Sequence, residues 1–248
     1  MNGLNSQTTV DYNEALQWAT ELGGSANFLA FWFPQERFVR ATRRGSSMSA
    51  TRIDGENVFA MAIGPDQVIE EDWTHFSLSQ DADPAIIDPS KFKQDGMWRA
   101  YSIETSHHKD SLPALTLTDN DEINNFLESN FPDSSVKAGN EEIVLWGGLR
   151  NEAGELVAVG GLAKWESGEL AAVSIGVHKD HYGKGLGQKI SAGLTRCALD
   201  LGHDKLCLGV FAENYPAIAV YEKCGYQLIE KFNHYALNEE TQRLRSRP

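Results

Sequence analysis

The sequence has few cysteines, no long hydrophobic run and no excess of basic residues. Among its 248 residues are only three cysteines, Cys197, Cys207 and Cys224. An odd number of cysteines without a CxxC pair is not typical of a disulfide framework or a zinc site. The longest uninterrupted apolar stretch, residues 28–33, is far shorter than the roughly 20 residues of a membrane-spanning helix. No signal sequence is recognisable, so we expect a soluble, cytoplasmic protein without a metal and without a membrane partner.

The balance of charges is acidic. The chain has 22 Lys and Arg against 35 Asp and Glu, a net charge of −13. Nucleic acids and anionic membranes attract positively charged proteins, so this balance argues against both as partners. It favours cationic ligands such as amines, although many soluble proteins are acidic without any such role. With 41% hydrophobic residues, the chain has the composition of a folded globular protein.

The chain divides into two parts near residue 110. Residues 79–96 combine two prolines and several aspartates with little periodic apolar pattern, which is typical of a long connection. Strand-like alternation follows over residues 97–105, before a polar break. We therefore predict an N-terminal part, residues 1–110, that has no chemical motif, and a C-terminal part, residues 111–248, that carries the chemistry.

The N-terminal part has the pattern of a small α/β unit. Amphipathic spacing predicts a helix over residues 12–22, and the aromatic run 28–33 predicts a strand. Two further strands, 48–53 and 58–63, flank Asp54-Gly55, a strong hairpin signal. A strip of arginines is the one local feature, and it either holds a phosphate or an acidic partner or is simply an exposed basic strip: Arg37, Arg40, Arg43 and Arg44.

The C-terminal part predicts a mixed, mostly antiparallel sheet flanked by helices. A helix capped by Asp119 or Asp121 runs to about Asn130. Short glycine-containing turns require the next three strands to pair as an antiparallel meander. The predicted strands are 142–149, 156–165, 169–177, 205–211 and 226–232, and the predicted helices after the meander are 185–201 and 215–223.

A glycine-rich turn joins the third strand of the meander to the following helix. It carries Gly183, Gly185 and Gly187. Glycines allow strained dihedral angles, so that several backbone N–H groups at the positive end of a helix can contact one anion. The turn contains neither a Walker A string nor a G-x-G-x-x-G fingerprint. It therefore predicts a phosphate or pyrophosphate site of another kind.

Two strings resemble the motifs of one family. The pattern V-x-x-x-x-[RQ]-x-x-G-x-[GA], matched by Val177, Gly185 and Gly187, resembles the acetyl-coenzyme A signature of the GNAT superfamily of acyl-CoA N-acyltransferases. Residues 214–226 are similar to the family's N-x-x-A-x-x-x-Y-x-x-x-G-[FY]. Two motifs in the right order seldom coincide by chance. The resemblance covers about residues 111–238, and it leaves the N-terminal α/β domain as either a degenerate copy of the same fold or a substrate lid.

The sequence departs from the family pattern at Tyr182, where the family usually has arginine or glutamine. A backbone cradle needs no side chain there, but support for the pyrophosphate would then come from Lys184 or Gln188. The resemblance implies that these residues bind acetyl-CoA: Ile175, Gly176, Val177, Tyr182, Gly183, Lys184, Gly185, Leu186, Gly187, Gln188 and Asn214.

The resemblance also implies direct acetyl transfer from acetyl-CoA to a primary amine through a tetrahedral intermediate. Backbone groups of residues 175–177 would pair with the pantetheine arm like a short strand, and an N–H of Val177 or its neighbour would polarise the thioester carbonyl. Tyr221, a phenol with a pKa of about 10 in model peptides, would protonate the departing thiolate.

The general base is the least defined role. In the family a carboxylate on the fourth strand, or a water chain, often accepts the proton of the amine, and the matching position here is Ala171. Glu169 shares its face of the strand and is the candidate base, followed by Glu213 and Glu166. Each of these three is otherwise a plain surface carboxylate.

Alternatives remain for several assignments. Asn214 could be only a helix cap and Tyr221 only a core residue, and we assign Gly225 to the end of a helix outright. Two other functions also remain open. One is a non-catalytic acyl-CoA sensor, and the other is an interaction protein that recruits a partner through its N-terminal half. The amine acceptor, a small molecule or a peptide, and the oligomeric state are left open.

Overall fold

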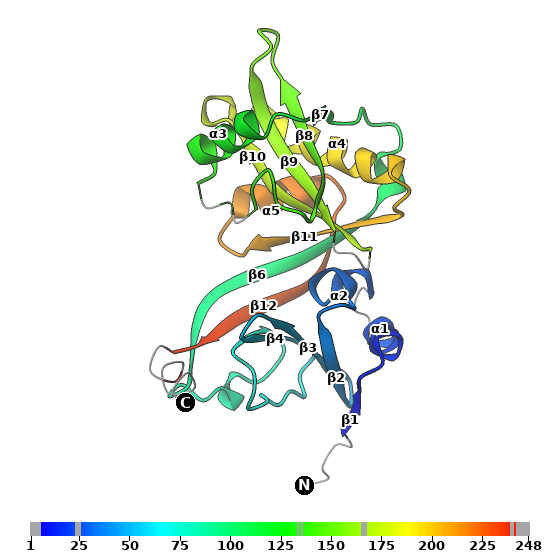
Figure 1. The fold of residues 1–248 in the computed structure, drawn as a ribbon, viewed down its shortest axis with the longest axis vertical. Coiled ribbons are helices and arrows are strands. Elements are labelled where there is room, and N and C mark those ends of the chain that lie inside the picture. Colours follow the sequence, from blue (N-terminus) through cyan, green and yellow to red (C-terminus); the bar gives the residue numbers. More distant parts are fainter. Residues whose placement is uncertain are drawn as a thin grey trace. The chain divides into compact units, whose positions relative to one another are not determined.

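The computed structural model describes residues 6–22, 26–132, 134, 136–164, 168–238 and 241. The described chain forms two compact units, and Figure 1 labels their α-helices and all of their strands except β5. Unit 1 takes its residues from 1–100, 211–213 and 228–248, and unit 2 from 101–210 and 214–227. Compactness does not decide where an independently folding domain ends, so the boundary near residue 110 stays a prediction.

Unit 1 is a twisted sheet with two helices. Its strands lie in the order β1-β2-β3-β4-β5-β12-β6, and all recorded pairs along it are antiparallel except β4 with β5. The elements are β1 (Ser6–Thr9), α1 (Tyr12–Glu21), α2 (Ala26–Trp32), β2 (Phe38–Arg44), β3 (Ser47–Asp54), β4 (Asn57–Ile63), β5 (His75–Ser79), the short 3-10 helix η1 (Pro84–Ile86), the first part of β6 (Phe92–Glu104), and most of β12 (Gln227–Leu237).

Local sequence explains much of unit 1. The side chain of Asp11 accepts hydrogen bonds from the N–H groups of Asn13 and Glu14, which fixes the start of α1. The predicted hairpin is confirmed as β3 and β4, and Gly55 in its turn has a φ of 61°. The tight turn thus sets the register of the two strands.

The strand predicted over residues 28–33 was wrong. The chain is helical there, since α2 covers Ala26–Trp32. A short run of consecutive apolar residues has no periodicity that separates a buried strand from a buried helix. Here the run packs on both sides, because Leu29, Phe31 and Phe33 are all buried.

Unit 2 has the same kind of sheet with more helices. Its strands follow the order β6-β11-β10-β9-β8-β7, of which β6 contributes its last residues, from Tyr101. The elements after β6 are η2 (Thr105–His108), β7 (Leu115–Leu117), α3 (Asn120–Asn130), β8 (Ile143–Arg150), β9 (Leu156–Lys164), β10 (Leu170–Val177), η3 (Lys179–His181), α4 (Leu186–Asp200), β11 (Lys205–Phe211, with Phe211 in unit 1) and α5 (Tyr215–Lys223).

The predicted elements of this unit are confirmed. Asp119 caps α3, and β8, β9 and β10 form the antiparallel meander. The last strand runs to Leu237, longer than predicted. The mixed, mostly antiparallel sheet with flanking helices is also confirmed.

Helix α4 lies close to the sheet because the strands beneath it carry glycine. A Cβ at Gly160 would lie 2.6 Å from Leu194 Cδ1, and one at Gly147 would lie 2.9 Å from Leu194 Cδ2. Both values are shorter than real carbon contacts allow. The paired glycines of β8 and β9 therefore set the depth at which α4 docks, and with it the position of the turn before α4.

The two units repeat one order of elements. Each begins with a short strand and one or two helices, continues with an antiparallel meander of three strands, and adds a fourth strand parallel to the third. In unit 2, α4 connects the last two of these strands, whereas residues 64–74 of unit 1 contain no helix. This order supports the prediction that the N-terminal part is a degenerate copy of the same fold.

Candidate active site

Strands β10 and β11 of unit 2 run parallel but share little of their length. The two strands are in register at one residue pair, Ala171 with Cys207, and β10 continues beyond it to Val177. The other edge of β10 stays bonded to β9, with Gly176 opposite Val159. Near the C-terminal end of β10, therefore, no strand among the described residues pairs with the edge that faces away from β9.

The alternation of the strand identifies the groups on this edge. The N–H of His178 donates to the carbonyl of Val157 on β9, at 2.9 Å. Successive residues of a strand point their backbone groups to opposite edges, so the N–H of Val177 points away from β9. Ile175, two residues earlier, lies within a register shift of β10, so the alternation does not fix the direction of its N–H. These are the residues predicted to pair with an extended ligand arm.

A bulge interrupts β10 at Ser174 and Ile175, before Gly176 and Val177. The register with β9 shifts between Val173 and Gly176, and Ser174 has a φ of 51°. The Ser174 hydroxyl lies 2.7 Å from Ser134 Oγ and donates to the carbonyl of Val136 at 3.1 Å. These bonds hold a backbone conformation that serine rarely adopts. No residue type at this place predicts the bulge, because the usual marker of a positive φ is glycine or asparagine.

The turn after β10 needs glycine at two positions. Gly183 has a φ of 74° and Gly185 a φ of 75°, and a Cβ at either would meet nothing within 4 Å. The backbone conformation, and not crowding, therefore requires glycine there. The space beside both residues is open to a ligand.

The N-terminus of α4 has unpaired backbone donors. Gly185 is its N-cap and has no side chain to accept a hydrogen bond, and the first helical bond runs from Lys189 N–H to Gly185 O. The N–H groups of Leu186, Gly187 and Gln188 thus lack partners within the helix. In a helix of 15 residues, these donors and the helix dipole favour an anion.

The dihedral angles of Gly187 differ from the prediction, while its role in binding acetyl-CoA stays a prediction. Its φ is not in the left-handed region, and a Cβ there would lie 3.2 Å from Val220 Cγ2 on α5. Gly187 therefore permits close packing of α4 on α5. The prediction that it adopts strained turn dihedrals was wrong, although its N–H remains one of the unpaired donors.

The side chains around the turn are mostly exposed. Tyr182 is 63% exposed, and Lys184 Nζ lies 3.5 Å from His181 Nδ1. Gln188 is half-buried. Their contacts with a pyrophosphate stay predictions.

Asn214 and Tyr221 both lie on or next to α5. Asn214 Oδ1 accepts a hydrogen bond from the N–H of Ala217 at 3.2 Å, so this side chain caps the helix. A further role in binding stays a prediction. Gly225, with a φ of 90°, follows the end of α5 as predicted.

Tyr221 is buried, with 7% of its surface exposed. Burial, and next the charge of a deprotonated Cys224, raise the pKa of its phenol, which therefore stays protonated at neutral pH. Among the described residues, no hydrogen bond involves its hydroxyl group. Tyr226, its neighbour in the same core, differs because its hydroxyl lies 2.9 Å from Thr195 Oγ1. The Tyr221 hydroxyl is thus free to donate to a ligand.

Glu169 precedes the first residue of β10. Its carboxyl is half-buried, and burial raises its pKa, while His203 and Lys205 act in the opposite direction. Six residues of extended strand separate it from Ile175, about 20 Å at 3.3 Å per residue. Its role as a base therefore requires a chain of waters, and it stays a prediction. Glu166 lies outside the described residues, and Glu213 is exposed.

Two further structural features bear on function. Within the described ranges, no group of three or more His, Cys, Asp and Glu side chains lies together in a way that could hold a metal ion. In the same ranges, no helix is both long and apolar enough to cross a membrane.

Comparison with known families agrees with this site. Residues 104–226 match the model of the acetyltransferase (GNAT) family. The matched segment contains the free edge of β10, the glycine turn, α4 and α5. Through this domain, about half of its length, the chain belongs to the GNAT acetyltransferase family.

Individual relatives are similar over shorter segments. The chain is 36% identical over 73 residues to a mycothiol acetyltransferase of Corynebacterium aurimucosum, which covers 27% of this chain and 24% of that protein. It is 40% identical over 60 residues, 24% of this chain, to the uncharacterized N-acetyltransferase YdgE of Bacillus subtilis, of which 38% is covered. The matches thus span well under half of these curated relatives.

Likeness of fold extends further than likeness of sequence. A GCN5-related N-acetyltransferase from Sphaerobacter thermophilus superposes with a TM-score of 0.59 over 96% of both chains, at 10% identity. At this identity the likeness concerns the fold alone. It includes unit 1, where no family motif was found.

Proposed function

We propose that the protein transfers an acetyl group from acetyl-CoA to a primary amine. One observation carries the proposal: the unpartnered edge of β10 leads directly into a glycine turn and the uncapped N-terminus of α4. An extended amide-containing arm that ends in a pyrophosphate fits this sequence of backbone donors.

The chain's own groups divide the work of binding. Val177 and Ile175 offer N–H and C=O groups that align the pantetheine amides and hold the thioester in one orientation. One of these N–H groups polarises the thioester carbonyl, where negative charge develops during attack. The N–H groups of Leu186, Gly187 and Gln188 hold the pyrophosphate, and Lys184 adds a positive charge in an acidic protein.

Tyr221 serves as the acid. Its raised pKa keeps the proton on the phenol at neutral pH, and its hydroxyl has no described hydrogen-bond partner to compete for that proton. When the amine attacks and the carbon–sulfur bond breaks, the phenol donates its proton to the thiolate. Water then reprotonates Tyr221 after release of CoA.

The proton of the attacking amine leaves through water toward Glu169. The raised pKa of this carboxyl makes it a better proton acceptor than an ordinary exposed glutamate. The acceptor is cationic before it reacts, and the net charge of −13 favours its approach.

Release of CoA thiol from acetyl-CoA, measured with a panel of primary amines, tests the proposal. Tyr221→Phe should lower kcat by roughly 100-fold or more, the usual contribution of a general acid, and leave the affinity for CoA unchanged. Tyr226→Phe is the matched control, because it removes a hydroxyl from the same core that is bonded to Thr195. It should retain the parent kcat.

Other outcomes would decide against the proposal. A clear thermal shift with CoA but no turnover with any amine would leave the sensor function instead. Equal losses of kcat in both tyrosine variants would mean that Tyr221 acts through packing and is not the acid.

A further inference from the structure

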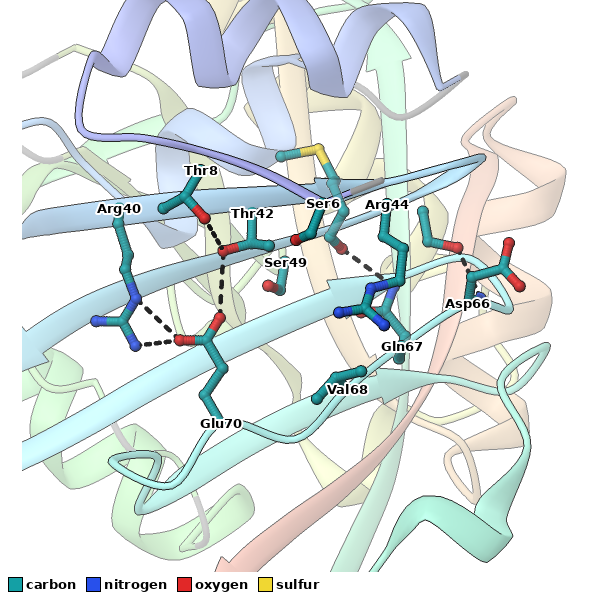
Figure 2. Close-up of a pocket in the computed structure, with 12 residues that line it drawn as sticks. Ser6, Thr8, Arg40, Thr42, Arg44, Ser49, Asp66, Gln67, Val68 and Glu70 are labelled. Carbon is teal, nitrogen blue, oxygen red and sulfur yellow. Dashed lines mark hydrogen bonds and ion pairs between the residues drawn. The ribbon is translucent and has the colours of Figure 1, made fainter. Parts of the chain in front are cut away.

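Unit 1 holds a polar cavity that the proposed transfer reaction does not use. Its volume is 280 Å³, well above the roughly 10–15 Å³ that a cavity needs to hold one water. Strands β1, β2 and β3 form its floor, and residues 66–70, which follow β4, form a wall (Figure 2). All of its lining residues belong to this one unit.

The cavity exists because unit 1 lacks the helix that covers the same place in unit 2. There, Thr116, Gly147 and Gly160 are neighbours across β7, β8 and β9, and Leu194 of α4 packs on the two glycines. In unit 1 the neighbours across β1, β2 and β3 all carry hydroxyls: Thr8 stands where unit 2 has Thr116, and Thr42 and Ser49 stand where unit 2 has the two glycines. Without a helix above it, this polar face opens into the cavity.

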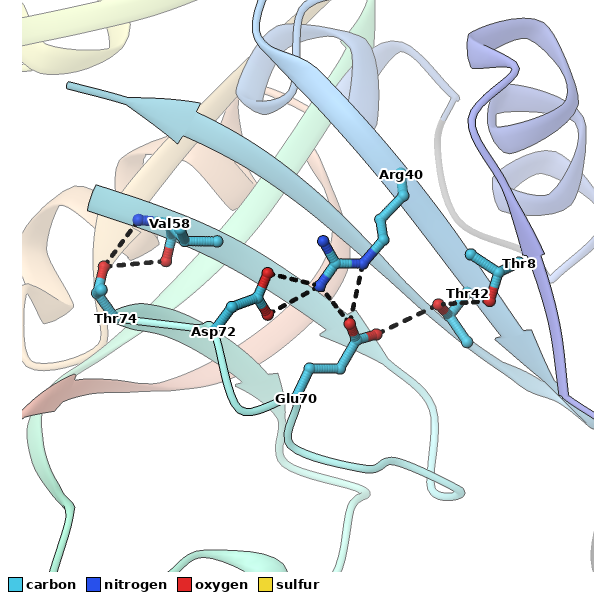
Figure 3. A network of polar contacts seen from close by, with 7 residues as sticks. All are labelled: Thr8, Arg40, Thr42, Val58, Glu70, Asp72 and Thr74. Carbon is cyan, nitrogen blue, oxygen red and sulfur yellow. Dashed lines mark hydrogen bonds and ion pairs between the residues drawn. The ribbon is translucent and has the colours of Figure 1, made fainter. Parts of the chain in front are cut away.

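One wall of the cavity is fixed by a network of charges (Figure 3). Arg40 donates from Nε to Glu70 at 2.9 Å and from a terminal nitrogen to Asp72 at 2.8 Å. Thr42 donates to Glu70 at 3.2 Å and contacts Thr8. These charged groups therefore pair with one another, and their hydrogen bonds hold the segment of Glu70 and Asp72 against β2.

Arg44 is different from the other arginines of the strip. Its side chain is half-buried in the cavity, and no ion pair or hydrogen bond among the described residues involves its guanidinium. Arg43, the preceding residue, points to the opposite face and pairs with Glu21. In a chain with 35 acidic residues, a half-buried arginine that lines a cavity and has no ion pair among the described residues indicates an anion site.

A second observation points to the same place. Ser49 is only 5% exposed, lines the cavity, and makes no hydrogen bond through its hydroxyl to any described residue. Its Oγ is not fully enclosed by protein atoms, so a ligand in the cavity can reach it. Figure 2 draws Ser49 and Arg44 on the same side of the strands, with Ser6 next to them.

We propose that this cavity binds a small hydroxylated monocarboxylate. Its carboxylate would accept two parallel hydrogen bonds from the Arg44 guanidinium, and its hydroxyls would bond to Ser49 and Ser6. Asp66 on the wall has no ion pair among the described residues and opposes any anion, so the ligand carries a single negative charge, which Arg44 neutralises. A phosphate dianion is disfavoured, because Asp66 and Glu70 on the wall repel the second charge.

Titration calorimetry with gluconate tests the proposal. Glucose has the same six carbons and several hydroxyls but forms a ring and lacks the carboxylate, and inorganic phosphate supplies the alternative anion. Gluconate should bind with one saturable site, while glucose and phosphate should not. Arg44→Gln should weaken gluconate binding at least tenfold, and the control Arg43→Gln, one residue away on the opposite face, should leave it unchanged.

Ser49→Ala provides a second variant that removes only a hydroxyl. It should weaken gluconate binding several-fold, and it decides the case should Arg44→Gln fail to fold. Absence of saturable gluconate binding to the parent would overturn the proposal. So would equal binding of glucose, equal losses in the Arg44 and Arg43 variants, or tighter binding of phosphate than of gluconate.

Discussion

A substitution at Gly185, compared with one at Gly154, separates the effect of a side chain on CoA binding from its effect on the stability of the fold. Gly185 has a φ of 75° and open space around its missing Cβ, and Gly154, in the turn between β8 and β9, has a φ of 83° and open space as well. A glutamate at either position occupies a left-handed conformation at a cost of about 1–2 kcal/mol. For a chain of this length the cost lowers Tm by roughly 2–8 °C, and the two variants should be equally destabilised.

Only the variant at Gly185 should lose affinity for CoA. A carboxylate roughly 6 Å from a doubly charged pyrophosphate is repelled by about 1.4 kcal/mol even at the dielectric constant of water. This repulsion corresponds to about tenfold in affinity, and the bulk of the side chain in the open space adds to it. Gly185→Glu should therefore weaken CoA binding at least tenfold, whereas Gly154→Glu should bind like the parent.

Calorimetric titration with CoA at low salt and thermal unfolding of both variants provide the two measurements. Equal CoA affinities for Gly185→Glu and the parent would show that the pyrophosphate does not bind at the start of α4. Equal losses of affinity in the two variants would assign the effect to stability.

Three further predictions concern stability. Ser174→Gly should be less destabilising than Ser174→Ala by about 1 kcal/mol, the reverse of the usual order in a strand. Both variants lose the bond to Ser134, but only alanine keeps the strain of a positive φ. Denaturant unfolding measures the two stabilities, and an alanine variant at least as stable as the glycine variant would contradict the prediction. Gly225→Ala should cost about 1–2 kcal/mol from its positive φ, plus displacement of the His107 ring, which lies 2.8 Å from the added Cβ; combining it with His107→Ala should recover the second part. Burial lowers the pKa of His75 below 6.5, so its contribution to stability is present above pH 6.5 and is lost as the pH falls through the folded-state pKa. In unfolding experiments from about pH 8 to 5, the free energy of unfolding should therefore fall less steeply with acid in His75→Gln than in the parent. An unchanged slope would refute this prediction.

Most elements could be predicted from the sequence because their signals are local. Asp119 caps a helix, Asp54-Gly55 turns a hairpin, and Gly225 ends α5, each through a bond or dihedral that spans a few residues. The run 28–33 failed for the opposite reason. Its apolar residues fit a buried helix as well as a buried strand, and tertiary packing decides between them.

In the candidate site, too, local sequence signals predict some features and long-range contacts determine others. Glycine at positions 183 and 185 predicts the positive φ found there. Ser174 also has a positive φ, but its residue type does not predict it, because a hydrogen bond with Ser134, 40 residues earlier in the chain, stabilises this conformation. Gly187 belongs to the same motif and yet serves helix packing against Val220. The cavity at Arg44 depends on a helix missing from unit 1, which only a comparison of the two units reveals.

The division of the chain between its units has a consequence for protein synthesis. Strand β12, at residues 227–237, is the partner of β5 in unit 1, although the rest of unit 1 is translated long before it. While residues 101–226 emerge from the ribosome, β5 must wait with one edge unpaired, and an open edge is the part of a sheet most ready to pair with a foreign chain. Slow translation, or a stop codon before residue 227, would therefore leave an aggregation-prone nascent sheet in the N-terminal half, far from the lesion itself.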